Sequence, residues 1–241
     1  MSRKRDTLHL AISTAADLGW RLDVLQDLGD RSEQEDAWAV ADVGGRLLVV
    51  IADGMGGHRG GREAALKAVD TFVDVAIARG FEVGEELLHA ALYAADAALP
   101  TGYRAPGTTL TAALLDEHGA TFAHVGDSIL WAEQGGTWYK RTERHGIGNI
   151  LELSLGGAGL RGDDVPPHFG TAEGDAFLLA TDGLSPDEGG GLWGGSDGRR
   201  SMAPADLGDD TLPLTLAAAR KAGSTDNATG ILLRRAEVSN A

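Results

Sequence analysis

The chain of 241 residues carries 36 Asp and Glu against 21 Lys and Arg, which gives a formal net charge of −15, and it contains no cysteine. The missing cysteine excludes disulfides, a thiolate zinc site and a cysteine nucleophile, while the negative charge disfavours nucleic acid and anionic membranes as partners. Because 43% of its residues are hydrophobic, the chain can bury a full core, and we predict a single domain over residues 1–241 with its functional core at about 20–235.

The N-terminal segment has the basic start of a signal peptide but a short apolar stretch that polar residues interrupt. No apolar run in the sequence approaches the ~20 residues that span a bilayer. We therefore expect a protein that stays in the cytoplasm and does not cross a membrane.

The first half of the chain predicts a strand, a hairpin and two helices. After an irregular N-terminus, residues 21–26 are typical of a strand, and residues 37–42 and 46–52 of a hairpin that turns at Gly44-Gly45. Apolar residues then recur at helical spacing from residue 62 until Gly80, and a second helix is predicted over 84–99.

The second half of the chain is richer in strands. Strands are predicted at 108–116, 120–125, 129–133 and 137–141, and we interpret them as one antiparallel meander. After an irregular segment at 143–174, we expect a strand at 176–180, a helix at 212–222 and a last strand at 228–234. Since the strands are grouped around paired helices without strict alternation, the pattern favours an α+β fold over a doubly wound parallel sheet.

Five aspartates stand beside small residues, next to these predicted strands: Asp36, Asp53, Asp127, Asp182 and Asp226. Each pair such as Asp-Gly or Asp-Asn is an ordinary turn sequence when taken alone. As a set they differ, because a rigid sheet can bring the ends of its strands to one edge. Hard divalent cations prefer carboxylate oxygens, so the set predicts a metal cluster.

Six short segments that contain these aspartates follow one another in a distinctive order. They are Arg31-Ser32-Glu33-Gln34-Glu35-Asp36, Ala52-Asp53-Gly54-Met55-Gly56-Gly57-His58, Gly107-Thr108-Thr109-Leu110, Val125-Gly126-Asp127-Ser128, Thr181-Asp182-Gly183-Leu184 and Asp226-Asn227-Ala228-Thr229. This order, from about Gly29 to Leu233, resembles the metal-dependent protein phosphatases of type 2C, and in particular their bacterial branch. The resemblance implies a four-layer α-β-β-α sandwich, with two antiparallel sheets flanked by helices and a metal centre at one end.

The resemblance also implies a centre of two Mn²⁺ or Mg²⁺ ions per chain. By this analogy Asp53 bridges the two ions and the carbonyl of Gly54 joins one of them. Asp182 and Asp226 bind the other ion. Two cations about 3.5–4 Å apart lower the pKa of a bridging water, and the resulting hydroxide would attack phosphorus in line.

Further residues receive roles from the same resemblance. Glu35 and Asp36 would hold metal-bound waters, and Arg31 matches the arginine that binds the substrate phosphate. Asp127 matches a position that helps Asp182 to hold a third, weaker metal ion in bacterial relatives. A purely turn-forming role for Asp127 stays open.

We therefore predict a serine/threonine phosphoprotein phosphatase that hydrolyses phosphomonoesters without a covalent intermediate, in agreement with the missing cysteine. Its partners would be proteins that a serine/threonine kinase has phosphorylated. We expect a monomer that binds neither nucleic acid nor membranes. Two alternatives stay open, a phosphatase-like regulatory or binding protein with little turnover and another two-metal hydrolase such as a nuclease.

Some residues depart from the family pattern. Met55 stands where animal members carry a histidine proposed as general acid, so the proton donor is unassigned, with His58 and a metal-bound water as candidates. The family's Asp-His after the fourth strand is replaced by Glu143-Arg144-His145. We interpret Arg144 and His145 as surface residues that close a loop, in preference to a role in substrate binding.

Other departures concern the surroundings of the predicted site. Gln34 stands where Asn is common, which leaves the neighbouring carboxylates intact. Arg59 and Arg62 would either meet an acidic or phosphorylated substrate or lie solvated at a helix start. Trp193, within the glycine-rich stretch 189–198, is either a contact residue of a mobile loop or a side chain docked on the core.

Overall fold

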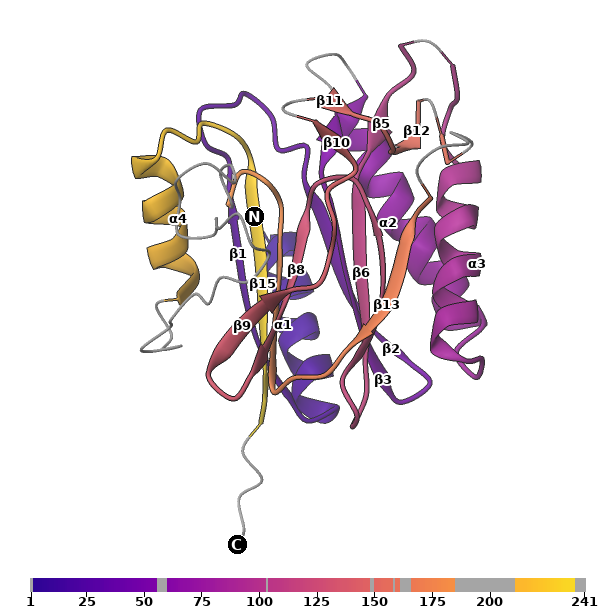
Figure 1. The fold of residues 1–241 in the computed structure, drawn as a ribbon, viewed down its shortest axis with the longest axis vertical. Coiled ribbons are helices and arrows are strands. Elements are labelled where there is room, and N and C mark those ends of the chain that lie inside the picture. Colours follow the sequence, from indigo (N-terminus) through magenta and orange to yellow (C-terminus); the bar gives the residue numbers. More distant parts are fainter. Residues whose placement is uncertain are drawn as a thin grey trace, which may run out of the picture.

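The computed structural model describes residues 2–55, 60–102, 104–147, 150–157, 159–160, 166–184 and 211–236, without the side chains of residues 2–7, 147 and 150. Within these residues, two antiparallel sheets of five strands pack face to face and carry helices on both outer faces (Figure 1). The predicted four-layer α-β-β-α sandwich is confirmed.

The two large sheets are built from strands that are distant in sequence. The first sheet contains, in spatial order, β1 (Trp20–Asp27), β15 (Ala228–Arg235), β14 (Ala176–Ala180), β8 (Ile129–Gln134) and β9 (Thr137–Lys140). The second sheet contains β13 (His168–Ala172), β7 (Ala120–Val125), β6 (Leu110–Leu115), β3 (Arg46–Ala52) and β2 (Ala37–Val43). Small sheets are formed by β12 (Leu155–Gly156), β5 (Gly107–Thr108) and β4 (Gly54–Met55), and by β10 (Gly146–Ile147) with β11 (Ile150–Leu151).

Helices cover the outer faces of both sheets. In Figure 1, α2 (Gly61–Ala78) and α3 (Gly84–Ala97) lie beside the second sheet and α4 (Thr211–Lys221) lies beside the first. Successive side chains of a strand point to opposite faces, so Val49 of β3 enters the core between the sheets while Val50 packs towards α2 and α3. This double burial explains the uninterrupted apolar sequence of β3.

The N-terminus forms a helix, so our expectation of an irregular segment was wrong. Helix α1 (Ser2–Asp17) packs against β1 and β2, which are one edge strand of each large sheet. It buries the small residues Ala11 and Ala15, whereas Leu10 and Ile12 are exposed. Because its large apolar side chains are not the buried ones, the helix lacks a clear apolar stripe in the sequence.

The predicted meander is also wrong, because its strands belong to different sheets. β6 and β7 form a hairpin in the second sheet, whereas β8 and β9 form one in the first. The chain changes sheets at Gly126, whose φ of 107° favours glycine and whose position against Thr109 has no space for a side chain.

The segment 143–174 is likewise less irregular than expected. It contributes β10, β11 and β12, and β13 forms an edge of the second sheet by pairing with β7. Gly170 of β13 packs against the ring of Phe122, where a side chain would collide. The other predicted strands and helices are found to within about two residues. No helix among the described residues is long and apolar enough to cross a lipid bilayer.

Candidate metal centre

The pairing of β2 with β3 brings two of the aspartates to the same end of the second sheet. Ala37 pairs with Ala52 in the antiparallel register, and the hairpin turn lies at the opposite end of both strands. Asp36 directly precedes β2 and Asp53 directly follows β3. The two carboxylates therefore face each other across the strand ends, as the sequence predicts.

The first sheet brings the other three aspartates to this end of the sandwich. Ala180 pairs with Ile129, so the register carried on by two residues sets Asp182 opposite Asp127. Ala180 also pairs with Gly230 of β15, the strand that Asp226 precedes. The negative charges of Asp127 and Asp226 both raise the pKa of Asp182, which places all three within electrostatic reach.

Asp36 connects the two sheets at the site. Its Oδ2 accepts hydrogen bonds from the hydroxyls of Thr229 at 2.7 Å and Thr181 at 3.1 Å, both from the first sheet. Its Oδ1 is buried and accepts no hydrogen bond from the described residues. Burial raises the pKa of Asp36 to about 7, although the two hydroxyls lower it. The sequence contains no signal for this link, because the three residues are far apart in the chain.

Asp53 is fixed by its backbone. Its N–H donates to the hydroxyl of Thr109 and its carbonyl accepts the Thr109 N–H, both at 2.9 Å. Burial raises the pKa of Asp53 well above its usual range, and Asp36 adds to the effect. Burial also raises the pKa of Asp182 to about 6, and the Oδ1 atom of Asp182 accepts no hydrogen bond from the described residues. Both groups are therefore suited to a cation that would replace the lost solvent.

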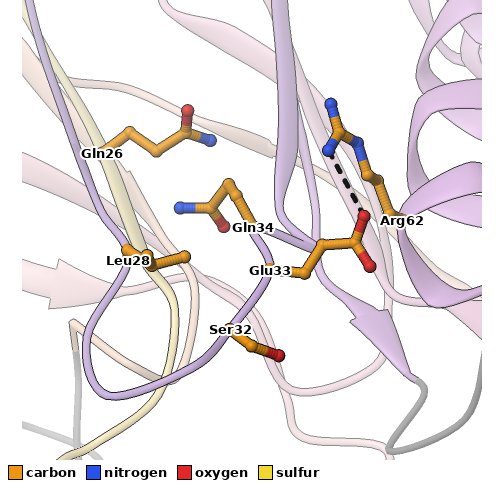
Figure 2. A pocket seen from close by; sticks show the side chains of 6 residues that line it. All are labelled: Gln26, Leu28, Ser32, Glu33, Gln34 and Arg62. Atoms are coloured by element: carbon orange, nitrogen blue, oxygen red, sulfur yellow. Dashed lines mark hydrogen bonds and ion pairs between the residues drawn. The ribbon is translucent and has the colours of Figure 1, made fainter.

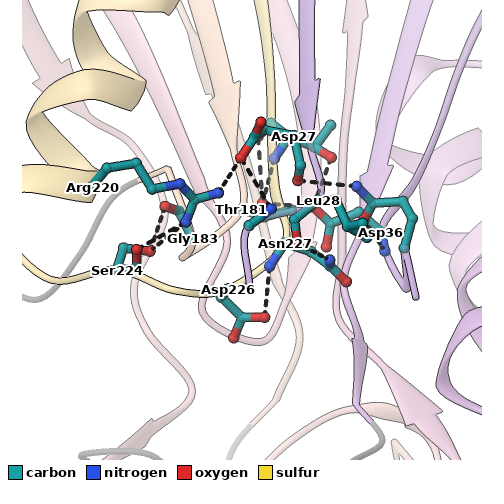
Figure 3. Close-up of polar contacts among 12 residues, drawn as sticks. Asp27, Leu28, Asp36, Thr181, Gly183, Arg220, Ser224, Asp226 and Asn227 are labelled. Carbon is teal, nitrogen blue, oxygen red and sulfur yellow. Dashed lines mark hydrogen bonds and ion pairs between the residues drawn. The ribbon is translucent and has the colours of Figure 1, made fainter. Parts of the chain in front are cut away.

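Asn227 joins three segments of the site, as Figure 3 shows in part. Its amide Nδ2 donates to the carbonyl of Leu28 and its Oδ1 accepts the N–H of Glu35, both at 2.8 Å. Its own N–H donates to the Oδ1 of Asp226 at 2.7 Å. In the sequence, Asn227 belongs to a turn pair and to one of the six motifs, but nothing there indicates that it joins three segments.

A second network supports the turn after Asp182 from the side of α4 (Figure 3). Arg220 contacts the Oδ1 of Asp27 at 2.5 Å and donates to the carbonyl of Ser224 at 3.0 Å. The hydroxyl of Ser224 in turn donates to the carbonyl of Gly183 at 2.9 Å. The roles of Asp27, Arg220 and Ser224 leave no signal in the sequence, since packing specifies each contact.

Arg31 lies at the site. Its Nη2 atom is 2.6 Å from the Oδ2 of Asp226, and its side chain is half exposed. Glu35, four residues later, has a pKa raised by partial burial and by the charge of Glu33. Gly54 is buried where a side chain would collide with the carbonyls of Gly61 and Glu35. Arg31, Glu35 and Gly54 thus occupy the same end of the sandwich as the aspartates.

Arg144 and His145 are not the surface residues that we expected. The Nη2 of Arg144 is 3.2 Å from the Oδ2 of Asp127, and their side chains are only 22% and 11% exposed. His145 is buried and stacks on His124, with ring centroids 5.0 Å apart. The loop they were expected to close therefore packs into the site.

A hollow of about 550 Å³ lies beside the centre (Figure 2). It is lined by Gln26, Leu28, Ser32, Glu33, Gln34 and Arg62. Arg62, at the start of α2, forms an exposed ion pair with Glu33 at 3.3 Å in the wall of this hollow, and both roles considered for it stay open. His58, Arg59 and Trp193 lie outside the described residues.

The donor set fits hard divalent cations. It consists of carboxylate oxygens, two of which, on Asp36 and Asp182, are buried without a hydrogen-bond donor in the described structure. Among the described residues, no three acidic or histidine side chains already enclose a point where a metal ion could sit.

Comparisons with known proteins agree with this geometry. The family model described as protein phosphatase 2C matches residues 28–207. Protein phosphatase PhpP of Streptococcus pneumoniae is 29% identical over an alignment of 253 positions that covers 88% of this chain and 96% of that protein. The serine/threonine phosphatase of S. agalactiae has the same fold, with a TM-score of 0.72 and 22% identity, over 89% of this chain and 99% of that one.

The catalytic domain of the serine/threonine phosphatase PstP, solved in complex with two manganese ions, also shares the fold. Its TM-score is 0.65 at 22% identity, over 90% of this chain and 99% of that chain. These relatives favour neither a regulatory protein without turnover nor a nuclease, and the prediction of a protein phosphatase is confirmed. Since the family model spans most of the sequence, the chain belongs to the protein phosphatase 2C family.

Proposed function

We propose that the protein releases phosphate from phosphoserine and phosphothreonine residues of other proteins, with two Mn²⁺ or Mg²⁺ ions held chiefly by Asp53, Asp182 and Asp226. The observation that carries this proposal is the gathering of five aspartates, from both sheets, with raised pKa values at Asp36, Asp53 and Asp182. Like charges at this spacing oppose folding, and perturbed carboxyl groups of this kind cluster at functional sites.

Two bound divalent cations supply the positive charge that activates water and stabilises a phosphoryl group in transfer. The chain's own residues then have separate tasks. Asp36, held by Thr181 and Thr229, and the neighbouring Glu35 would orient water by accepting its hydrogen bonds. The carbonyl of Gly54 adds a neutral oxygen ligand beside Asp53.

Arg31 would bind the phosphoryl oxygens of the substrate. A guanidinium offers two parallel donors to a phosphate, and the exposed side chain of Arg31 is free to exchange its contact with Asp226 for such a partner. The hollow beside Arg31, which Glu33 and Arg62 help to line, would receive the peptide that flanks the phosphorylated residue. Glu33 would offer this peptide a negative charge and Arg62 a positive one.

We extend the proposal to the protein as a whole. Its substrates would be the products of a serine/threonine kinase, and it would act as a monomer in the cytoplasm, with residues 1–241 as one phosphatase domain. The net charge of −15 supports the expectation that it binds neither nucleic acid nor anionic membranes.

The test is phosphate release from phosphoserine and phosphothreonine peptides by the wild type, in Mn²⁺, in Mg²⁺ and in chelator. We expect release only with metal, and its loss in Asp182→Asn. Asp74→Asn, which alters an exposed carboxylate on α2, is the matched control and should retain activity. Full activity in chelator would contradict the metal mechanism, and no release with either metal would leave a protein that binds phosphopeptides without turnover.

A further inference from the structure

The ion pair between Arg144 and Asp127 lies at the edge of the proposed centre and is largely shielded from water. The Nη2–Oδ2 distance is 3.2 Å, and the two side chains are 22% and 11% exposed. At such burial a charge pair is screened by water far less than it is on the surface. This pair is therefore unlike the exposed ion pairs elsewhere on the molecule, such as Arg79 with Glu82.

Asp182 is a neighbour of this ion pair. The register of β14 and β8 sets it opposite Asp127, the partner of Arg144. These are the two carboxylates that the family resemblance places around a third, weaker metal ion.

The backbone on both sides of this pair is fixed by buried groups. His145 donates its N–H to the carbonyl of Gly126 at 2.8 Å, and Gly126 donates its N–H to the Nδ1 of His145 at 3.1 Å. The Nε2–H of His124 donates to the carbonyl of Glu143 at 2.9 Å. The neighbours of Arg144 and of Asp127 are therefore clamped to each other, and the contact is a built part of the fold.

We propose that Arg144 is a permanent cation in the place where the resemblance puts a third metal ion, so that this chain operates with two metal ions. A divalent ion could reach Asp127 only by displacing the guanidinium, which would then lie partly buried beside an ion of the same sign. The guanidinium itself stays charged at every pH at which the protein is folded, and its Nη2 donates to the Oδ2 of Asp127. The inference rests on the proposed two-metal function.

The test counts Mn²⁺ ions bound per chain by equilibrium dialysis, with electron paramagnetic resonance of the free ion as a second readout. We expect two in the wild type and in Arg144→Lys, and a third in Arg144→Gln. The third ion should disappear when Asp127→Asn is added to Arg144→Gln. Arg79→Gln, which removes another arginine paired with a carboxylate far from the site, is the matched control and should bind two.

Several outcomes would overturn the inference. A third ion that binds to the wild type and is lost in Asp127→Asn would show that Arg144 does not exclude a third ion. A count of two ions in folded Arg144→Gln would show that the guanidinium of Arg144 is not what keeps a third ion away. If Arg144→Gln fails to fold, as judged by circular dichroism, the comparison of wild type with Asp127→Asn decides, since both should bind two. A wild type that binds no Mn²⁺ would instead contradict the proposed function itself.

Discussion

Replacing Asp182 with asparagine should make the metal-free protein more stable while removing its response to metal. Burial and the charges of Asp127 and Asp226 raise the pKa of Asp182 from 3.8 to about 6. When the pKa of a carboxyl group is higher in the folded than in the unfolded state, its ionisation lowers the free energy of unfolding. For Asp182 this loss is absent below pH 3.8, grows between pH 3.8 and 6, and is constant above pH 6. At pH 7.5 the full loss applies, and Asp182→Asn lacks it.

The size of the effect follows from the shift. About two pKa units at about 1.4 kcal/mol each amount to roughly 3 kcal/mol, which is an upper value because asparagine also changes the local hydrogen bonds. For a chain of this length, 1 kcal/mol moves the melting temperature by roughly 2–4 °C. In chelator at pH 7.5, Asp182→Asn should therefore melt up to about 6–12 °C above the wild type.

The assay is thermal unfolding, followed by circular dichroism, of both proteins in chelator at pH 7.5 and at pH 4. The difference between them should be largest at pH 7.5 and should nearly vanish at pH 4, where Asp182 is protonated. In Mn²⁺ the order should reverse, because a ligand that binds only the folded state stabilises the wild type. Asp74→Asn should match the wild type throughout. Equal stability at pH 7.5, or a difference that does not depend on pH, would refute the reasoning.

Three more predictions concern residues around the centre. Asn227→Ala should lower the free energy of unfolding, measured in urea, by about 1–3 kcal/mol, since it leaves the N–H of Glu35 and the carbonyl of Leu28 without their partner. An unchanged free energy of unfolding would show that water replaces the side-chain amide of Asn227. Burial lowers the pKa of His124 to about 3. Between about pH 6.5 and pH 3 the unfolded chain therefore carries a proton on this residue that the folded chain lacks. As the pH falls through this range, the free energy of unfolding should decrease. Nuclear magnetic resonance should find its imidazole neutral down to pH 4.5, and a midpoint near pH 6 would contradict its burial. Arg31→Lys should reduce kcat/KM for a phosphopeptide by about tenfold or more while the bound Mn²⁺ count stays the same, because an ammonium group cannot replace the bidentate fork; a loss of Mn²⁺ instead would assign Arg31 to the metal centre.

The amino-acid sequence by itself determined where the chemistry lies along the chain. The strands before Asp53 and Asp182 are recognisable because they are buried on both faces and are therefore continuously apolar. The hairpin at Gly44-Gly45 is a local event, and its register alone sets Asp36 opposite Asp53. Properties that depend on neighbours in sequence were thus predictable.

Only the tertiary structure decided how these segments meet. The chain crosses between the sheets at Gly126, and α1 packs through small alanines against one edge strand of each sheet, β1 and β2. Asn227 holds Glu35, Leu28 and Asp226 together. Many of the contacts that fix the carboxylates join residues far apart in the chain, and such partners leave no period or local motif in the sequence. The same reason explains Arg144, which as an isolated residue is typical of a surface loop and becomes the partner of Asp127 only when the loop packs against the strand ends.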